Sequence, residues 1–571
     1  MKVAAKDLRL SQCRFNSLAD WNAPAPLGAG EQVWLLATAL IASLTAIFWS
    51  ATHHAFLLYG DAEAHLHIAR RLLDSHRPGL GQLGSVWLPL PHLIIAPFAA
   101  VDGWWRDGFA PVIPSALCYL AAVLGLYRLA RKWLAPVSSG FAIALFAANP
   151  NLLYMQTTAM TEPLFLAELI WSVLLVVEWR SALDSPARMP LSMPGAQYLW
   201  PLIGVLVCAV ETRYDGWILA FSAWLMMAVT LARRGVLLQR RFVLASFVLL
   251  AAPVSWMVYN AVYFGDWLDF MRGPYSAKAI ELRTSGGVLP PHPGWHNPWV
   301  STLFFWKTSE LDSFARGWGW VLLAFSVAGA ILLFLRGKNT ADRDGKSVAP
   351  ALRWTLLLWF PLPFYAYSVS YGSVPIFLPI WWPHAWYNTR YGMEMLPGFA
   401  FAFGFAAERL LLATRQRLVI AVGLAVAVVA NLGAMIEQGP LVYVEGYKNY
   451  QARGYYNQTI GSAIARLHAL DPRGCLLLDT SSFPTIVPRA GMTYRETLNE
   501  SDKQFFRAAL DAPSMHADMV LAFSGDEVAE AVRAHPDHLR LDQCFHFRGQ
   551  AGACLYVSDI SPLARVNCAH P

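Results

Sequence analysis

The sequence predicts a polytopic α-helical membrane protein with about eleven transmembrane helices and a small α/β domain outside the membrane at the C-terminal end. Its 571 residues are 56% hydrophobic and only 14% charged, whereas a soluble domain carries about 25% charged residues. Uncharged runs such as 33–50 and 318–335 are long enough to cross a bilayer core of about 30 Å. From about Glu437 this hydropathy pattern stops, and short alternating segments replace it.

The predicted helices follow one another with short connections up to residue 436. The run 33–50 is longer than the apolar region of a signal peptide, and further spans follow it, so we expect an uncleaved first helix. By hydropathy, the helices centre near 33–50, 110–130, 134–149, 162–179, 198–212, 216–232, 242–261, 318–335, 352–371, 392–412 and 418–436.

Basic clusters precede the first span and then follow every second one. They lie at 1–14, 131–132, 180–188, 233–241, 336–346 and 409–417. The positive-inside rule therefore predicts a plasma (inner) membrane protein with a cytoplasmic N-terminus and, because the span number is odd, an extracytoplasmic C-terminal domain. The net charge of +6 is modest and gives no reason to expect a nucleic-acid partner.

Two long outer segments, 51–109 and 262–317, depart from this charge bias. The first holds Arg70, Arg71 and Arg106. Long loops cross the membrane regardless of charge, so the topology stands. These cations nevertheless predict contact with membrane lipids or another anionic ligand, such as a lipid phosphate.

The segment 437–571 is predicted to form the small α/β domain, and 1–436 the transmembrane domain. "CLLLDTSSF" and "DMVLAFSG" are typical of short buried strands, "EVAEAVRAH" of a helix and "CFHFRGQAGACLYVS" of a hairpin. Cys544 and Cys554 flank the hairpin. Either they pair in an oxidising compartment or the hairpin geometry keeps them apart, and the sequence leaves both open.

The first candidate site is "YGDAEAHLHIARRLLD" (59–74), an amphipathic helix too short and too charged to span, which we expect to lie flat on the outer interface. Asp61 stands at its start, either as a catalytic carboxylate or as an N-cap. The two roles are compatible, because the helix dipole keeps an N-terminal carboxylate ionised. Glu63 is either a ligand contact or a solvated first-turn acid, and His65 beside it is either a metal ligand or structural.

Two further candidates lie where spans begin on the outer side. Glu162, in "TEPLF", starts the fourth span, where a charge is costly and more often functional than structural. Arg213 and Asp215, in "ETRYDGW", are two residues apart and would not share a helix face. In a turn ending at Gly216 they would point into one pocket; otherwise they form a hydrated hairpin turn.

The remaining candidates lie in later outer loops. Tyr275 and Lys278, in "GPYSAKAIELR", are candidate ligand contacts. Arg390 and Tyr391 stand where the chain enters the tenth span. An arginine at that depth either holds a lipid-linked phosphate bidentately or extends its side chain to the lipid headgroups.

In this order, "YGDAEAHLHIARRLLD", "WLPLPHLIIAPF", "TEPLF", "TRYDGW" and "RYGMEMLPGFAF" resemble the motifs of GT-C superfamily glycosyltransferases. The similarity is greatest to the dolichyl-phosphate-mannose protein mannosyltransferase and aminoarabinose transferase group and covers about residues 30–410. The mannosyltransferases have adjacent Asp and Glu in the first outer loop. Here Ala62 separates Asp61 from Glu63, which leaves open which acid has the family role.

The resemblance implies an inverting glycosyltransferase that takes a sugar from a polyprenyl phosphate and gives it to a hydroxyl of a protein, lipid or glycan on the outer face. It implies Asp61 as general base, Glu162 orienting the acceptor or a metal, and Arg390 at the departing phosphate. The resemblance does not decide whether a divalent metal ion is needed as a cofactor. The implied substrate-binding residues are Glu63, His65, Arg213, Asp215, Tyr275, Lys278, Arg390 and Tyr391.

Other function classes fit the sequence less well. An oligosaccharyltransferase would have to hold two phosphates and would need a metal-binding acidic pair, which is not evident. A lipid or solute transporter typically has internal repeats and broken helices near the midplane, whereas here the ionisable residues gather at the outer edge. A scaffold would not need Asp61, Glu162 and Arg390 on one side. The prediction therefore depends on these three residues converging on one cavity.

Overall fold

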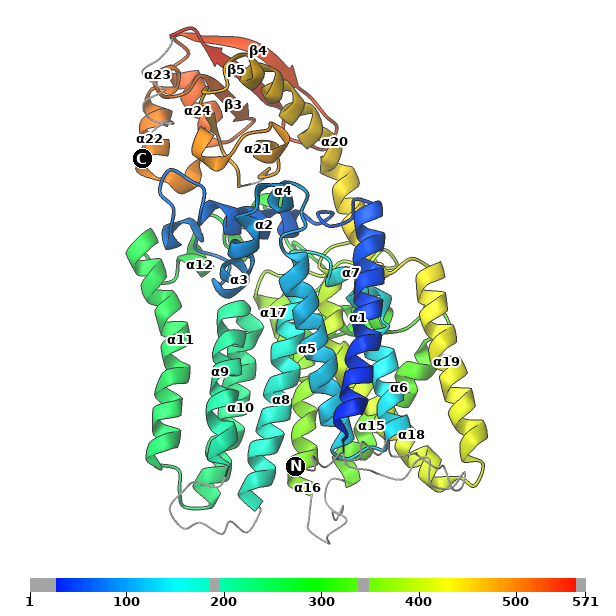
Figure 1. The fold of residues 1–571 in the computed structure, drawn as a ribbon. Coiled ribbons are helices and arrows are strands. Elements are labelled where there is room, and N and C mark those ends of the chain that lie inside the picture. Colours follow the sequence, from blue (N-terminus) through cyan, green and yellow to red (C-terminus); the bar gives the residue numbers. More distant parts are fainter. Residues whose placement is uncertain (1–26, 185–194, 337–348, 482, 561–571) are drawn as a thin grey trace, which may run out of the picture.

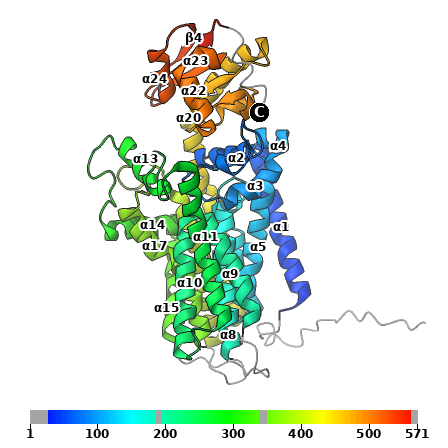
Figure 2. The same ribbon diagram turned by 90° about the vertical axis from the view of Figure 1, so that its left-hand side faces the viewer.

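The computed structural model describes residues 27–184, 195–336, 349–481 and 483–560. Figure 1 shows a bundle of roughly parallel helices with a smaller sheet domain at its upper end, and Figure 2 shows the same two parts from the side. Helix α20 (Leu441–Leu470) rises from the bundle into the sheet domain. The basic N-terminal stretch 1–14, Arg188 and most of 336–346 lie outside the described residues.

The bundle is that of a multi-pass membrane protein. Within the described ranges, six helical segments are long and apolar enough to cross a membrane. All the predicted spans coincide with helical segments, but several are too short to count by length, so the number eleven stays a prediction. The main helices are α1 (Ala29–Thr52), α5 (Val112–Arg131), α6 (Pro136–Ala147), α8 (Glu162–Asp184), α9 (Ala196–Thr212), α10 (Tyr214–Arg233), α11 (Arg240–Phe264), α15 (Trp320–Arg336), α18 (Leu396–Ala413) and α19 (Arg417–Glu437).

The predicted span 352–371 is not one continuous helix. After α16 (Ala349–Arg353) it runs as a 3₁₀ segment, η2 (Trp354–Trp359), and then as α17 (Pro361–Tyr371). Pro361 and Pro363 lack the backbone N–H that a regular helix would use, which explains the break.

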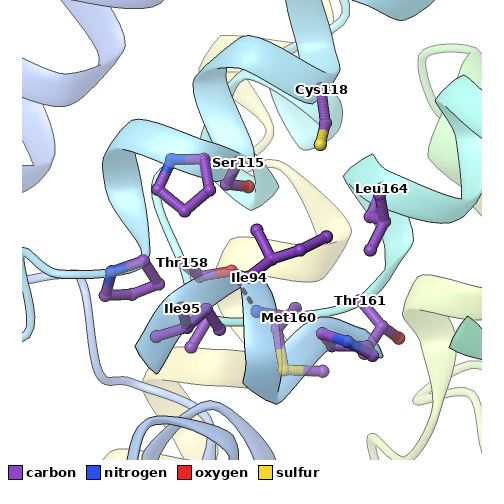
Figure 3. A pocket seen from close by; sticks show the side chains of 12 residues that line it. Ile94, Ile95, Ser115, Cys118, Thr158, Met160, Thr161 and Leu164 are labelled. Carbon is purple, nitrogen blue, oxygen red and sulfur yellow. Dashed lines mark hydrogen bonds between the residues drawn. The ribbon is translucent and has the colours of Figure 1, made fainter. Parts of the chain in front are cut away.

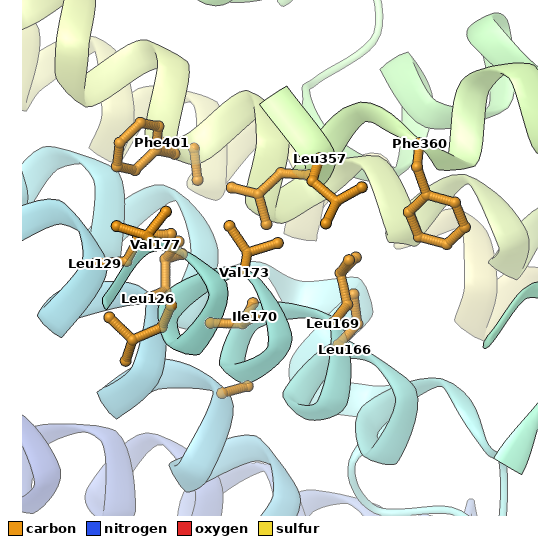
Figure 4. Close-up of a cluster of buried hydrophobic side chains, with 14 of the residues drawn as sticks. Leu126, Leu129, Leu166, Leu169, Ile170, Val173, Val177, Leu357, Phe360 and Phe401 are labelled. Atoms are coloured by element: carbon orange, nitrogen blue, oxygen red, sulfur yellow. The ribbon is translucent and has the colours of Figure 1, made fainter. Parts of the chain in front are cut away.

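The core of the bundle lies between α5, α8, η2 and α18. Figure 4 shows part of this cluster of buried side chains, with Leu126 of α5, Val173 of α8, Leu357 of η2 and Phe401 of α18. Side-chain packing rather than exclusion of water holds helices together in lipid, so close fit matters. By contrast, α1, α11 and α19 lie at the periphery and expose most of their apolar side chains, as lipid-facing helices do.

Short helices occupy the upper end of the bundle, beneath the sheet domain (Figures 1 and 2). They are α2 (Gly60–Arg71), η1 (Leu80–Gln82), α3 (Leu90–Ala99), α4 (Asp102–Arg106), α7 (Pro150–Met155), α12 (Asp269–Arg272), α13 (Ala277–Thr284), α14 (Pro298–Ser313) and η3 (Thr389–Met395). This layer carries all the candidate site residues except those at the starts of α8 and α10.

The C-terminal part contains a five-stranded sheet in the order β2-β1-β3-β5-β4. Strands β1 (Leu476–Leu478), β2 (Thr497–Leu498) and β3 (Met519–Phe523) are parallel, and β4 (Leu539–Phe545) and β5 (Ala553–Ser558) add an antiparallel hairpin. The predicted strands are β1 and β3, and the predicted hairpin is β4–β5. The other elements are α21 (Ile486–Arg489), η4 (Tyr494–Glu496), η5 (Glu500–Asp502), α22 (Gln504–Asp511), α23 (Pro513–His516) and the predicted helix, α24 (Glu527–Ala534).

Cys544 and Cys554 form a disulfide across the hairpin. They are direct partners in the register of β4 and β5, and their Cα atoms are 4.1 Å apart. The register therefore decides between the two alternatives that the sequence left open. A disulfide of this kind is typical of a compartment outside the cytosol.

Helix α2 does not expose its polar face to water, so the alternative that Glu63 is a solvated first-turn acid is wrong. Glu63, His67 and Arg71 are all buried, because the sheet domain covers that face. The Arg71 guanidinium donates to Thr480 Oγ1 at 3.2 Å and pairs with Glu500 at 3.3 Å.

Arg70 and Arg106, the other two cations named in the first outer loop, also have partners inside the protein. Arg70 pairs with Asp74 and Asp102, at 3.0 and 3.2 Å. Arg106 donates to the carbonyl oxygen of Pro488. These charges attach the first outer loop to itself and to the sheet domain, so they require no lipid phosphate.

We expect Arg71→Ala to loosen this attachment. The substitution removes two charge-assisted hydrogen bonds and leaves Glu500 buried without its cation, which costs about 2 kcal/mol. Thermal unfolding of the purified full-length protein in detergent should therefore show a lower midpoint. Arg533→Ala is the matched control, because Arg533 is exposed on α24 of the same domain. An equal effect of the two substitutions would contradict this account.

Candidate functional site

Arg390 is the centre of a charged cluster at the upper end of the bundle. Just before it, Asn388 adopts a left-handed backbone (φ 56°), and the chain turns into η3. Arg390 Nη2 lies 2.6 Å from Asp61 Oδ2, and Nε lies 3.1 Å from Glu162 Oε1. Arg390 Nη1 lies 3.6 Å from Glu445 Oε1. The structure thus brings Asp61, Glu162 and Arg390 together, from α2, the start of α8 and η3.

Asp61 is not an N-cap. Helix α2 begins at Gly60 and its N-cap residue is Tyr59, so Asp61 stands in the first turn with its carboxylate free to turn toward Arg390. The Asp61 side chain is 44% exposed, whereas the side chain of Glu162 is fully buried and that of Glu445 is 5% exposed. Asp61 is therefore the one of these three carboxylates that a molecule from outside can reach.

Arg213 is the second cation of the cluster. It is an extended residue (φ −149°, ψ 153°) between α9 and α10, which is the predicted turn. Its Nη1 lies 3.2 Å from Glu162 Oε1 and its Nε 2.9 Å from Asp215 Oδ2. At Gly216 an added Cβ would overlap the carbonyl oxygen of Ala209, so the turn depends on glycine there. Because Glu162 Oε1 contacts both Arg213 and Arg390, Glu162 bridges the two arginines.

Aromatic rings complete the surroundings of the cations. The Tyr391 ring centre lies 5.1 Å from Arg213 Cζ and 4.9 Å from Arg390 Cζ, and the Tyr59 ring centre lies 5.4 Å from Arg390 Cζ. Such cation–π contacts fix a guanidinium without neutralising it. Tyr365 stacks on Tyr391, and its hydroxyl donates to Glu394 Oε1 at 2.7 Å.

Two carboxylates of the cluster were missed from the sequence. Glu394 Oε1 lies 3.1 Å from Arg213 Nη2. It follows Arg390 within "RYGMEM", at the start of a predicted span, and an acid in that position could have indicated a functional residue. Glu445 lies on α20, in the part of the chain assigned to the outer domain, and nothing in its local sequence indicates the contact. Five carboxylates thus surround two arginines: Asp61, Glu162, Asp215, Glu394 and Glu445.

Glu63 and His65 contact neighbours outside this cluster. Glu63 is buried and forms an ion pair with Arg453 of α20. His65 Nδ1 lies 2.9 Å from His92 Nε2, and its ring packs against Trp87. Burial, together with the charges of Arg390 and Arg213, lowers the pKa of His65 to about 3. Within the described ranges, no three His, Cys, Asp or Glu side chains are arranged to hold a metal ion.

Tyr275 and Lys278 also lie apart from the cluster. Tyr275 is partly exposed; desolvation by neighbouring segments of the chain, together with the carboxylates of Asp479 and Glu500 in the sheet domain, raises its pKa. Lys278 is exposed on α13 and forms no salt bridge with any residue that the structure describes. Neither residue contacts Asp61, Glu162 or Arg390 in this structure.

An apolar cavity adjoins the cluster (Figure 3). It lies between α3, the start of α5 and the segment 158–164, and its volume is about 30 Å³. Thr161 belongs to both features, because it lines the cavity while its hydroxyl accepts from Arg213 Nη1 at 2.9 Å. The lining side chains include Ile94, Ile95, Ser115, Cys118, Met160 and Leu164.

The position of Arg390 depends on Gly392, where η3 packs directly against α14. A Cβ at Gly392 would lie 2.5 Å from Asp312 Oδ2 and 2.6 Å from the carbonyl carbon of Thr308. We expect Gly392→Ala to push η3 outward, to cost about 1–3 kcal/mol of stability and to reduce ligand binding at Arg390. Gly433→Ala on α19 is the control, because nothing lies within 4 Å of its added Cβ.

The two variants are compared by thermal unfolding and by the binding of a lipid phosphate, the anionic ligand that the sequence leads us to expect at Arg390. If Gly392→Ala behaves like Gly433→Ala in both measurements, the close contact between η3 and α14 does not position Arg390.

The fold is shared with a known protein. The crystal structure of ArnT from Cupriavidus metallidurans bound to undecaprenyl phosphate matches 94% of this chain and 99% of that chain, with a TM-score of 0.50 at 14% sequence identity. Its apo structure matches 92% and 98%, with a TM-score of 0.45 at 14% identity. No protein-family model and no curated protein sequence matches the chain. The GT-C fold predicted from the motifs is therefore confirmed, and the likeness is one of fold.

Proposed function

We propose that the protein is an inverting glycosyltransferase that moves a sugar from a polyprenyl phosphate to an acceptor hydroxyl at the upper end of the bundle. The observation that carries the proposal is the contact of Arg390 with one exposed carboxylate, Asp61, and one fully buried carboxylate, Glu162. The shared fold supports the donor class, because the ArnT structure contains undecaprenyl phosphate.

In the proposed reaction Asp61 is the general base. The acceptor oxygen attacks the anomeric carbon from the face opposite the phosphate, and Asp61 takes the acceptor proton. Arg390 stabilises the charge that develops on the phosphate. Glu162 is fully buried and bonded to both arginines, so we assign it a positioning role rather than contact with the acceptor.

The apolar cavity beside Thr161 supports binding of a lipid donor. Its lining includes apolar side chains from α3 and α8 together with Thr161, whose hydroxyl accepts from Arg213. Part of an isoprenoid chain would bury apolar surface there while its phosphate reached the charged cluster.

We also propose that the upper end faces out of the cell across the plasma membrane. The basic stretch 233–241 joins α10 to α11, and Arg415 and Arg417 lie between α18 and α19, at the end away from the sheet domain (Figure 1). The positive-inside rule places that end in the cytoplasm. The disulfide between Cys544 and Cys554 agrees with an outer sheet domain.

The test uses membranes that contain the full-length protein and a panel of labelled polyprenyl-phosphate sugars. Label that moves into protein, lipid or glycan fractions identifies both the sugar and the acceptor class. A diphosphate-linked glycan included in the panel tests for oligosaccharyltransferase activity. A transporter would move the labelled lipid between leaflets with its sugar–phosphate bond intact, and that result would overturn the proposal.

A further inference from the structure

Of the three carboxylates around Arg390, only Asp61 is free to move away from the guanidinium. Among the described residues, Asp61 accepts its only hydrogen bond from Arg390, and its side chain is 44% exposed. Glu162 is fixed by both arginines. Glu445 accepts from the Thr389 backbone N–H at 2.9 Å and from the Tyr59 hydroxyl at 3.3 Å. An anion that arrives from outside therefore meets Arg390 where Asp61 now lies.

The charge around Arg390 opposes simple addition of a phosphate. Its guanidinium already lies near three carboxylates, and its own side chain is only 6% exposed. A further anion beside Asp61 would meet repulsion in a site of low dielectric constant. Replacement of Asp61 by the anion keeps the number of charges at Arg390 unchanged.

We propose that Asp61 and the donor phosphate exchange places on Arg390 in each catalytic cycle, an inference that rests on the proposed function. The acceptor O–H bond breaks and its proton goes to Asp61, while the acceptor oxygen bonds to the anomeric carbon. The anomeric C–O bond to phosphate breaks, and its electron pair stays on the phosphate oxygen. Asp61 loses its negative charge when it takes the proton. The phosphate gains one negative charge when the phosphodiester becomes a phosphomonoester.

The total charge of the site is thus constant through the reaction, and protonated Asp61 cannot compete for Arg390 at the step in which the phosphate gains its extra charge. In the resting protein the same contact makes Asp61 a competitor of the phosphate. Removal of the Asp61 charge should therefore tighten phosphate binding even though it removes the base.

The experiment measures direct binding of undecaprenyl phosphate to the purified full-length protein. We expect Asp61→Asn to bind about tenfold more tightly than the wild type. Asp102→Asn is the control, because Asp102 is an exposed acid of the same outer loop that pairs with Arg70 and Arg106 instead; its affinity should equal that of the wild type. In an Arg390→Gln background, Asp61→Asn should give no tightening, since the two residues would no longer be coupled.

Thermal unfolding and elution volume establish that each variant is folded. If folded Asp61→Asn binds no more tightly than the wild type, or if the tightening persists with Arg390→Gln, the exchange is wrong. If neither the folded wild type nor the folded Asp61→Asn variant binds undecaprenyl phosphate, the proposed donor class fails, and the exchange fails with it. Failure of the exchange alone therefore leaves binding of undecaprenyl phosphate intact, whereas failure of the donor class abolishes it.

Discussion

We expect Asp61→Asn to lower kcat by about 10²- to 10⁴-fold, the range typical of removal of a general base. The amide has nearly the shape of the carboxylate but cannot take the acceptor proton. Asp61 lies in the first turn of α2 with its carboxylate 2.6 Å from Arg390 and open to the outside. Because the side chain is partly exposed and makes one contact, its substitution should leave folding and membrane insertion unchanged.

The measurement is single-turnover transfer from a labelled polyprenyl-phosphate sugar, with the amount of inserted protein determined in the same membranes. Asp102→Asn is a suitable control, because Asp102 is an exposed outer-loop acid that pairs with Arg70 and Arg106, outside the charged cluster. If Asp61→Asn retains wild-type turnover, another group removes the acceptor proton, and the role assigned to Asp61 is lost.

The sequence predicted the residues of the cluster better than their surroundings. Glu162 and Arg390 stand where apolar spans meet outer loops, where a charge is costly enough to need a reason, and Asp61 starts the amphipathic helix of the first outer loop. Arg213 and Asp215 were likewise expected from the turn at Gly216, which the structure contains. These signals are local, so one sequence is enough to show them.

Contacts between distant parts of the chain could not be predicted in this way. Glu445 and Arg453 on α20 reach Arg390 and Glu63 of the upper layer, and Glu500 of the sheet domain pairs with Arg71. Each partner is a common charged residue whose local sequence fits an exposed surface. The polar face of α2 was therefore expected to lie in water, whereas the sheet domain covers it.

We expect Arg390→Lys to reduce kcat/KM by about 10²- to 10³-fold, comparable with the loss of one donor to a developing oxyanion. Arg390 holds Glu162 through Nε and Asp61 through Nη2, so its planar fork spans two partners from α8 and α2. A lysine keeps the positive charge, and the buried carboxylates therefore stay compensated. A single ammonium group, however, cannot hold Glu162 and also present a donor in the position of Nη2.

The effect should be greater on kcat than on the KM of the donor, because the phosphate gains its extra charge only as the sugar leaves. Arg390→Ala goes further: it weakens donor binding as well, and it destabilises the protein because Glu162 and Glu445 lose a buried cation. Arg283→Lys, an exposed arginine on α13, is the control. A folded Arg390→Lys variant with wild-type kcat would mean that Arg390 organises Asp61 and Glu162 but takes no part in the departure of the phosphate.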